Sequence, residues 1–463
     1  MKFNSPEFLF FFLAVALFSR WAPARLRVYG LLAASLVFYG WWSVPFLGLL
    51  VGTCVLDWWV GLRMAATGSP SARRGWLVVS LVSNLGVLFA FKYLDLFLAT
   101  LHLAATWAGG TGEPLALHLI LPLGISFYTF QSMSYTIDVY RGQMKPCRDL
   151  PTFVLFVTFF PQLVAGPIVR ASDLIPQLER GPVHEEGRFR EGFPLMAWGF
   201  VKKMVLADRL APFADSIFNH PSDHGGVAAL LGVYAFAVQI YCDFSGYTDI
   251  AIGCARVLGF RFEPNFNGPY LAGSIREFWR RWHMSLSTWL RDYLYVPLGG
   301  NRGGEARRDR NLMLTMLLGG LWHGAAWHFV AWGGYHGALL AGERRLERWI
   351  PVPRGWIGRA LATLVTFHLV CLGWVLFRAE SLPAAGAILS RIAGGGEGTS
   401  LLSGMLGLLL AGFVVVAWVE KARPFSDLLR RSPFAATVAT WGGGLIAVVL
   451  GASSTVPFIY FQF

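Results

Sequence analysis

The chain has 463 residues, of which 55% are hydrophobic and only 14% are charged. Soluble domains carry about 25% charged residues, so this composition argues against a cytosolic enzyme. The net charge of +12 resides in short basic loops between apolar segments, as the positive-inside rule describes, and it does not indicate nucleic-acid binding.

The first apolar segment, 8–18, is short enough to be a signal peptide. Its basic residues follow it instead of preceding it, at Arg20, Arg25 and Arg27. This order favours a retained first helix whose C-terminal end lies in the cytoplasm.

The apolar content predicts an all-α polytopic membrane protein with about 10–12 transmembrane helices, together with re-entrant and interfacial helices. Long segments expected to span lie at 28–42, 45–64, 76–108, 356–377, 401–419 and 433–450. The segment 76–108 is long enough to bend or to form two helices. A Gly-rich outer loop is expected after Arg378. Shorter segments, interrupted by Pro, Gly or charge, lie near 115–137, 150–169, 193–218 and 226–260.

The segment 273–300 mixes Arg, Trp and apolar residues, which predicts an amphipathic helix lying at the membrane interface. Arg280, Arg281 and Arg291 are suited to bind lipid headgroups or a phosphorylated cytoplasmic donor. The spacing alone favours an ordinary basic interfacial helix.

The apolar segment 312–341 has basic residues at both ends, so both ends are expected in the cytoplasm. Its length leaves two interpretations, a re-entrant pair of half-helices or one long tilted helix. His323 would lie about 20 Å into a membrane core of roughly 30 Å. A neutral imidazole there is suited to act as general base on a hydroxyl, although the residues alone favour a helix-packing histidine. The packing role is expected for His328 and His336.

Two further features carry polar groups into apolar surroundings. Asp243 and Asp249 require partners, for which Arg256 or Arg276 are expected; a structural ion pair is favoured over a proton relay. The aromatic tail 452–463 carries the hydroxyl of Tyr460, and its composition favours a frayed interfacial anchor over a segment folded back into a cavity.

The five cysteines are scattered and follow no zinc or redox spacing, which predicts buried small side chains and no metal site. Neither a repeat nor a soluble domain is visible in the sequence. We therefore expect residues 1–463 to form a single membrane domain.

Several long segments resemble the membrane-bound O-acyltransferase family, in its bacterial branch. They are EFWRRWHMSLSTWLRDYLYVPLGGNRGG, GGLWHG, LPLGISFYTFQSMSYTIDVYRG, FFPQLVAGPIVR, YCDFSGYTDIAIG, PNFNGPY and the terminal PFIYFQF. The resemblance covers the whole chain and is densest from 120 to 340. The PLGGNRGG and FIYFQF segments favour the alginate-type, polysaccharide-acetylating subgroup.

This resemblance implies a fold that funnels toward a central catalytic histidine, which in the WHG motif is His323. The family's second histidine, in RWH, is His283, for which a catalytic role and a structural or donor-positioning role are both open. The implied reaction moves an acetyl group from a cytoplasmic thioester to a hydroxyl reached from outside. Acetyl-CoA is the expected donor substrate, with no bound cofactor, and Tyr460 is a possible acyl relay.

The resemblance also implies a bacterial inner-membrane location and an extracytoplasmic partner, an SGNH-type acetyltransferase. The expected acceptor is an alginate-like exopolysaccharide, with peptidoglycan O-acetylation or D-alanylation of another cell-wall polymer as alternatives. From a different class, a polysaccharide or lipid transporter would use broken helices and buried carboxylates along a permeation path. A scaffold for a polysaccharide synthase is a third interpretation.

Overall fold

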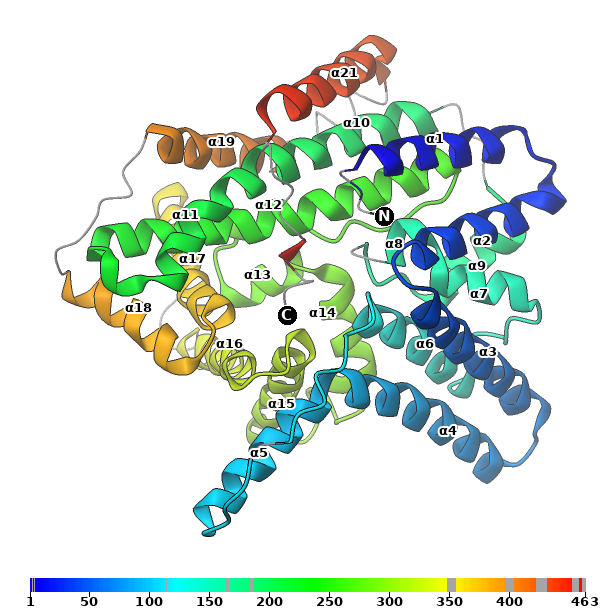
Figure 1. Cartoon of the computed structure of the whole chain (residues 1–463), viewed down its shortest axis with the longest axis horizontal. Helices are drawn as coiled ribbons and strands as arrows, with labels where there is room; N and C mark the ends of the chain where they lie inside the picture. The colour runs from blue at the N-terminus through cyan, green and yellow to red at the C-terminus, as the bar shows by residue number, and fades with distance from the viewer. Residues whose placement is uncertain are drawn as a thin grey trace. The chain divides into compact units, whose positions relative to one another are not determined.

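The computed structural model describes residues 1, 3, 5–113, 115–163, 166–182, 187–347, 355–395, 404–421, 431–451 and 458–459. All regular structure in this part of the chain is helical (Figure 1). The chain folds into two compact units, Met1–Gly192 with Ala251–Glu263 and Phe193–Ile250 with Pro264–Phe463. The long helix α12 continues from the second unit into the first. The expectation of a single domain stays a prediction.

The first unit is built from the helices drawn in blue and cyan in Figure 1. They are α1 (Pro6–Trp21), α2 (Ala24–Gly40), α3 (Val44–Ala66), α4 (Pro70–Leu88), η1 (Phe89–Tyr93), α5 (Leu94–Trp107), α6 (Ile125–Tyr140), α7 (Leu150–Thr158), α8 (Phe160–Leu163) and α9 (Ala171–Arg180). The bend expected within 76–108 occurs at η1, a π-helical turn that joins α4 to α5.

The second unit carries the remaining helices and all of the predicted site residues. They are α10 (Arg188–Phe200, which begins in the first unit), η2 (Val201–Ala207), α11 (Asp208–Asn219), η3 (Pro221–Asp223), α12 (Gly226–Leu258), η4 (Pro269–Leu271), α13 (Ile275–Arg281), α14 (Met284–Leu290), η5 (Arg291–Tyr295), α15 (Glu305–His323), α16 (Trp327–Leu346), α17 (Trp356–Arg378), α18 (Leu382–Gly394), α19 (Gly404–Lys421) and α21 (Pro433–Leu450).

Helix α18 occupies most of the region where a Gly-rich loop was expected. Ser381 caps its N-terminus by accepting a hydrogen bond from the Ala384 amide (3.3 Å), and Pro383 stands in its first turn. A Ser cap followed by Pro is a strong helix-start signal, because both satisfy or remove amides that have no intrahelical partner. The loop expectation was wrong since it weighed only the glycines that follow.

Five helices in the described residues are long and apolar enough to cross a membrane: Val44–Ala66, Pro70–Trp107, Gly226–Leu258, Trp356–Arg378 and Pro433–Leu450. The last of them exposes large apolar side chains, including Phe434, Trp441 and Val448. Such a surface is suited to contact the lipid of a membrane. The structure therefore confirms a helical polytopic membrane protein, and the expected count of 10–12 spans stays a prediction.

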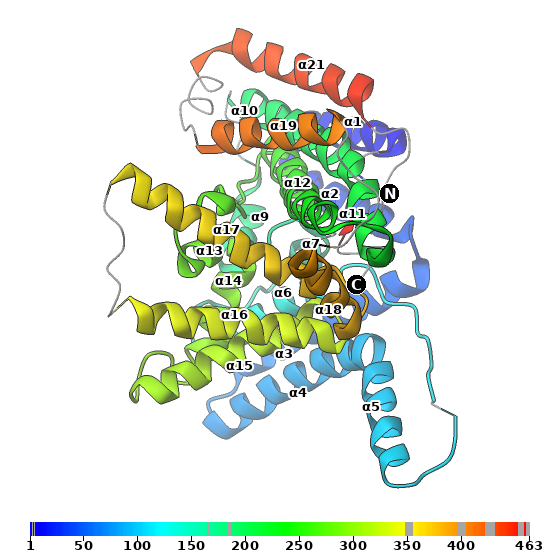
Figure 2. The same cartoon turned by 90° about the vertical axis from the view of Figure 1, so that its left-hand side faces the viewer.

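The segment 312–341 forms a helical hairpin and is not one long tilted helix. Helices α15 and α16 lie side by side (Figure 2), and Gly320 and Gly333 make this approach possible. A Cβ on either glycine would come closer than 3.0 Å to a backbone oxygen of the other helix. Small residues at a helix interface let two backbones approach closely in just this way.

The segment 273–300 also differs from its prediction as one continuous amphipathic helix. It consists of two seven-residue helices, α13 and α14, followed by the π-helical turn η5. The break falls at His283, whose φ of 43° lies in the left-handed region that a residue with a Cβ rarely adopts. The location of this segment at the membrane interface stays a prediction.

Candidate functional site

His323 ends helix α15 at the tip of the hairpin. A Cβ on the next residue, Gly324, would overlap the ring of Phe329, so a larger residue at this turn would displace that ring. The imidazole is buried and packs edge to face against Trp322, Trp332 and Phe377, with ring centroids 5.0, 5.1 and 5.3 Å away. The turn and the aromatic rings together fix the position of the ring.

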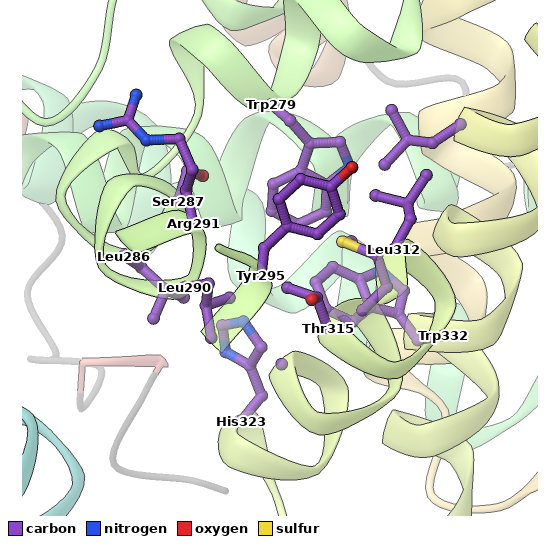
Figure 3. A pocket seen from close by; sticks show the side chains of 13 residues that line it. Trp279, Leu286, Ser287, Leu290, Arg291, Tyr295, Leu312, Thr315, His323 and Trp332 are labelled. Atoms are coloured by element: carbon purple, nitrogen blue, oxygen red, sulfur yellow. The ribbon is translucent and has the colours of Figure 1, made fainter. Parts of the chain in front are cut away.

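A cavity of about 200 Å³ reaches this imidazole. Figure 3 shows the side chain of His323 and that of Arg291 on separate sides of the cavity lining. The side chain of Arg291 is 61% exposed and its guanidinium pairs with Asp292 (2.7 Å), whereas His323 is buried. The lining residues come from α13, α14, η5, α15 and α16: Trp279, Leu286, Ser287, Leu290, Arg291, Tyr295, Leu312, Thr315, Met316, Gly319, His323, Trp332 and Leu340. A mostly apolar cavity therefore joins an exposed cation to a buried imidazole.

Of the three arginines predicted to bind a donor or a headgroup, only Arg291 lines the cavity. Arg280 is exposed on α13. Arg281 pairs with Glu277 one turn back on the same helix and also contacts the carbonyl oxygen of Gly268. The break between α13 and α14 separates these two arginines from Arg291. In a continuous helix the three side chains would have lain on adjoining faces.

His283 is fully buried beside the same tryptophan that flanks His323, with ring centroids of His283 and Trp322 6.2 Å apart. Its Nδ1 lies 3.3 Å from Oδ1 of Asn265, and that oxygen also accepts hydrogen bonds from the hydroxyl (2.9 Å) and the amide (3.1 Å) of Ser285. Burial lowers the pKa of His283 to about 3, which keeps the ring neutral. His283 is not among the lining residues of the cavity.

Asn265 was missed as a site residue, although it stands in the PNFNGPY segment that carries the family resemblance. Its main-chain oxygen accepts a hydrogen bond from the Met284 amide (2.9 Å) while its side chain holds Ser285. These bonds to the two residues that follow His283 stabilise its positive φ. A polar residue in a Pro- and Gly-rich loop was the available signal.

The structure gives Asp243 and Asp249 lysine partners where arginines were expected. Lys203 pairs with Asp243 (2.5 Å), and Lys202 pairs with Asp249 (2.7 Å). The expected arginines have partners of their own: Arg256 binds Glu191 and Arg276 binds Glu347.

The lysines reach α12 because two glycines face each other where α10 passes it. A Cβ on Gly199 would lie 2.5 Å from the carbonyl oxygen of Gly246, and a Cβ on Gly246 would lie 2.8 Å from that of Gly199. This close approach brings the adjoining residues Lys202 and Lys203 within reach of the carboxylates on α12. Sequence spacing along α12 carried no information about this contact.

Two residues of the C-terminal tail are described, and they are docked instead of frayed. The ring of Phe458 is 1% exposed and lies 4.4 Å from that of Tyr247. The Ile459 amide donates a hydrogen bond to Oδ2 of Asp243 (2.7 Å). Tyr460, the predicted relay residue, lies outside the described residues.

The remaining histidines of the hairpin differ in their contacts. Nδ1 of His328 donates to the carbonyl oxygen of Leu376 (3.0 Å), which joins α16 to α17 as expected of a packing histidine. His336 is fully buried among aromatic rings, including those of Trp279 and Trp332. The five cysteines are all buried, as predicted. No group of three or more His, Cys, Asp or Glu in the described part of the chain is arranged to hold a metal.

A sequence profile of the membrane-bound O-acyltransferase family matches residues 147–379, the region that contains the cavity and both histidines. The probable alginate O-acetylase of Azotobacter vinelandii is 47% identical over 428 residues, which cover 90% of this chain and 84% of that protein. The chain belongs to the membrane-bound O-acyltransferase family.

Other members of the family differ in the polymer that their names record. A peptidoglycan O-acetyltransferase of Helicobacter pylori is 38% identical and covers 85% of this chain and 80% of its own length. A teichoic acid D-alanyltransferase of Bacillus subtilis is 30% identical over 56% of this chain and 69% of its own length. As a member of the membrane-bound O-acyltransferase family, the protein is an O-acyltransferase, and the transporter and scaffold interpretations lose their support.

Proposed function

We propose that this O-acyltransferase takes an acetyl group from acetyl-CoA on the cytoplasmic side of the bacterial inner membrane and delivers it to hydroxyls of an alginate-like extracytoplasmic polysaccharide. The observation that carries the proposal is the cavity that joins the exposed Arg291 to the buried His323. The high identity to a probable alginate O-acetylase supports the choice of acyl group and polymer.

His323 acts as the general base in this proposal. The acceptor hydroxyl gives its proton to the imidazole, its oxygen bonds to the thioester carbonyl carbon, and the carbon–sulfur bond breaks. The CoA thiolate leaves and takes the proton from the imidazolium, so that the products are an acetyl ester and free CoA. Aromatic rings around the imidazole exclude water, which limits wasteful hydrolysis of the thioester.

The size and lining of the cavity favour entry of the acyl end of the donor alone. Pockets that enclose a whole drug-sized ligand measure about 300 to 1,000 Å³, whereas this cavity measures about 200 Å³. The apolar lining suits a slender thioester arm, and the exposed guanidinium of Arg291 is suited to pair with donor phosphates at the surface. Arg280 and Arg281 act on headgroups or on the bulk of the donor outside the cavity.

His283 serves as a positioning residue for the Trp322 and His323 wall, because its ring is buried, neutral and held by Asn265. Tyr460 acts as the acyl relay: its hydroxyl accepts the acetyl group first and then passes it to an extracytoplasmic partner of the SGNH type. Asp243 and Asp249 contribute as structural ion pairs with Lys203 and Lys202.

Radiolabelled acetyl-CoA tests the proposal with membranes that hold the protein together with its SGNH-type partner. His323→Ala is expected to abolish CoA release and acetyl transfer. His328→Gln is the matched control, since it changes a buried histidine on the same hairpin that lies outside the cavity lining. Full activity of His323→Ala would overturn the general-base role, and full polymer acetylation by Tyr460→Phe would overturn the relay.

The acceptor is tested by offering alginate and peptidoglycan fragments in parallel. Acetylation of peptidoglycan in preference to alginate would replace the proposed polymer, an outcome to which the Helicobacter pylori relative points. Transfer of a D-alanyl group from a carrier protein, without transfer of acetyl from acetyl-CoA, would replace the proposed acyl group.

A further inference from the structure

The described part of the C-terminal tail, Phe458 and Ile459, makes a main-chain contact to a buried carboxylate. The Ile459 amide donates to Oδ2 of Asp243 at 2.7 Å, and Asp243, Phe458 and Ile459 are each at most 2% exposed. A hydrogen bond to a charged acceptor is roughly twice as strong as one between neutral groups, and burial strengthens it further. The tail makes this contact through its backbone, and the hydrogen bond does not involve the side chain of Ile459.

The carboxylate that receives this bond is fixed from its other side. Lys203 lies 2.5 Å from Oδ1 of Asp243 and 2.7 Å from Oδ1 of Asp208, so one lysine bridges two carboxylates. Because Gly199 and Gly246 pack backbone to backbone, the segment that carries Lys203 cannot move away from α12 without losing that contact. Oδ2 of Asp243 is thus presented to the tail in one orientation.

The ring of Phe244 connects the docked Phe458 to His283, a predicted site residue. Phe244 packs edge to face against His283 (centroids 4.7 Å apart) and also contacts Phe458 (5.7 Å). Phe458 itself is enclosed by Phe244 and Tyr247, residues of α12 that follow Asp243 within about one helical turn. The ring of Phe458 and the amide of Ile459 therefore dock onto a single face of α12.

We propose that Asp243, oriented by Lys203, is a positioning residue that docks the C-terminal segment onto α12 next to His283. In the sequence Ile459 directly precedes Tyr460, so the same contact anchors the segment that carries the relay. That consequence rests on the proposed function, whereas the docking itself does not.

Thiol labelling tests the docking without requiring activity. Ile459→Cys places a single probe on the tail of a chain whose five native cysteines are buried, and its rate of reaction with a membrane-impermeant maleimide is measured in the full-length protein. Adding Asp243→Asn is expected to raise that rate at least about tenfold, the equivalent of about 1.4 kcal/mol. Lys203→Met is expected to act in the same direction.

Asp249→Asn is the matched control. It removes a second carboxylate–lysine pair from the same helix, and the described tail residues make their hydrogen bond to Asp243. Asp249→Asn should leave the labelling rate of the Ile459→Cys probe unchanged. Equal labelling rates in the Asp243→Asn and Asp249→Asn backgrounds would overturn the proposal.

A second measurement avoids changing Asp243. Cysteines introduced by Tyr247→Cys and Phe458→Cys, at positions whose native rings lie 4.4 Å apart, are expected to be joined by a flexible bifunctional thiol reagent. Failure of this crosslink in a monodisperse sample would also overturn the docking. If labelling and crosslinking succeed but the wild-type protein transfers no acetyl group, the proposed function fails and the docking stands.

Steady-state kinetics then separate a positioning role of Asp243 from a general loss of folded protein. Asp243→Asn is expected to lower kcat for polymer acetylation while the KM for acetyl-CoA stays unchanged, because neither described tail residue lines the donor cavity. Asp243→Glu, which keeps a carboxylate, should recover part of the rate. A rise in the KM for acetyl-CoA with an unchanged kcat would contradict the positioning role.

Discussion

Replacing Gly333 by alanine tests whether the close packing of α15 and α16 sets the geometry of the site. The new Cβ would lie 2.9 Å from the carbonyl carbon of Met316 and 3.1 Å from Cα of Leu317, where ordinary contact begins at 3.4 Å. The carbonyl oxygen of Met316 lies closer still, and all three neighbours are backbone atoms. The helices must therefore separate by more than 0.5 Å, the difference between 3.4 and 2.9 Å that the carbonyl carbon alone requires.

The expected loss of stability follows from two opposing effects. Overpacking costs about 1 to 3 kcal/mol, and backbone neighbours favour the upper end of that range. Alanine gains about 1 kcal/mol over glycine in helix propensity, which leaves a net destabilisation of about 2 kcal/mol. At roughly 2 to 4 °C per kcal/mol, the apparent Tm should fall by about 4 to 8 °C.

Thermal unfolding in detergent, followed by a dye that reacts with the buried cysteines as they become exposed, measures this shift. Gly342→Ala on the same helix is the control, because nothing lies within 4 Å of its new Cβ, and it should leave the Tm unchanged or raise it. A displacement of His323 by half an ångström or more should also lower kcat by at least about tenfold. If Gly333→Ala proves as stable and as active as Gly342→Ala, the close contact does not determine the site.

Three further outcomes follow from the same structure. Met316→Ala enlarges the cavity next to His323. Because burial of each of the two extra methylenes of butyryl-CoA contributes about 0.8 kcal/mol, the kcat/KM of butyryl-CoA relative to acetyl-CoA should rise about tenfold. An unchanged ratio in a competition assay would place the acyl group elsewhere. His328→Ala removes the bond to Leu376 and should lower the free energy of unfolding by about 1 kcal/mol with acetyl transfer retained, as measured by apparent Tm and activity together. The pKa of His283 is about 6.5 in the unfolded chain and about 3 in the folded chain, so the free energy of unfolding should fall as the pH drops below 6.5. The fall should be smaller in His283→Gln. Equal pH profiles of Tm in the two proteins would contradict a buried neutral ring.

The hairpin of α15 and α16 shows how much of the site could be predicted from the sequence. The length of the apolar segment 312–341 and the basic residues at its ends limited it to two interpretations, and the WHG motif identified His323 by resemblance. Neither pattern indicated that Gly320 and Gly333 face backbone atoms of the opposite helix, since that depends on the rotation of each helix about its axis. The cavity beside His323 follows from that rotation and was therefore not predictable.

Sequence by itself determined the class of this protein: scarce charge and long apolar segments require helices in lipid, because only a helix satisfies its own backbone there. It also supplied the family, through long ordered motifs. Tertiary structure alone decided the partners of the buried charges. Lys202 and Lys203 pair with Asp249 and Asp243 across a contact between helices, and the tail folds back onto Asp243 from 216 residues away. Such pairings depend on which helices pack together, which local spacing does not encode.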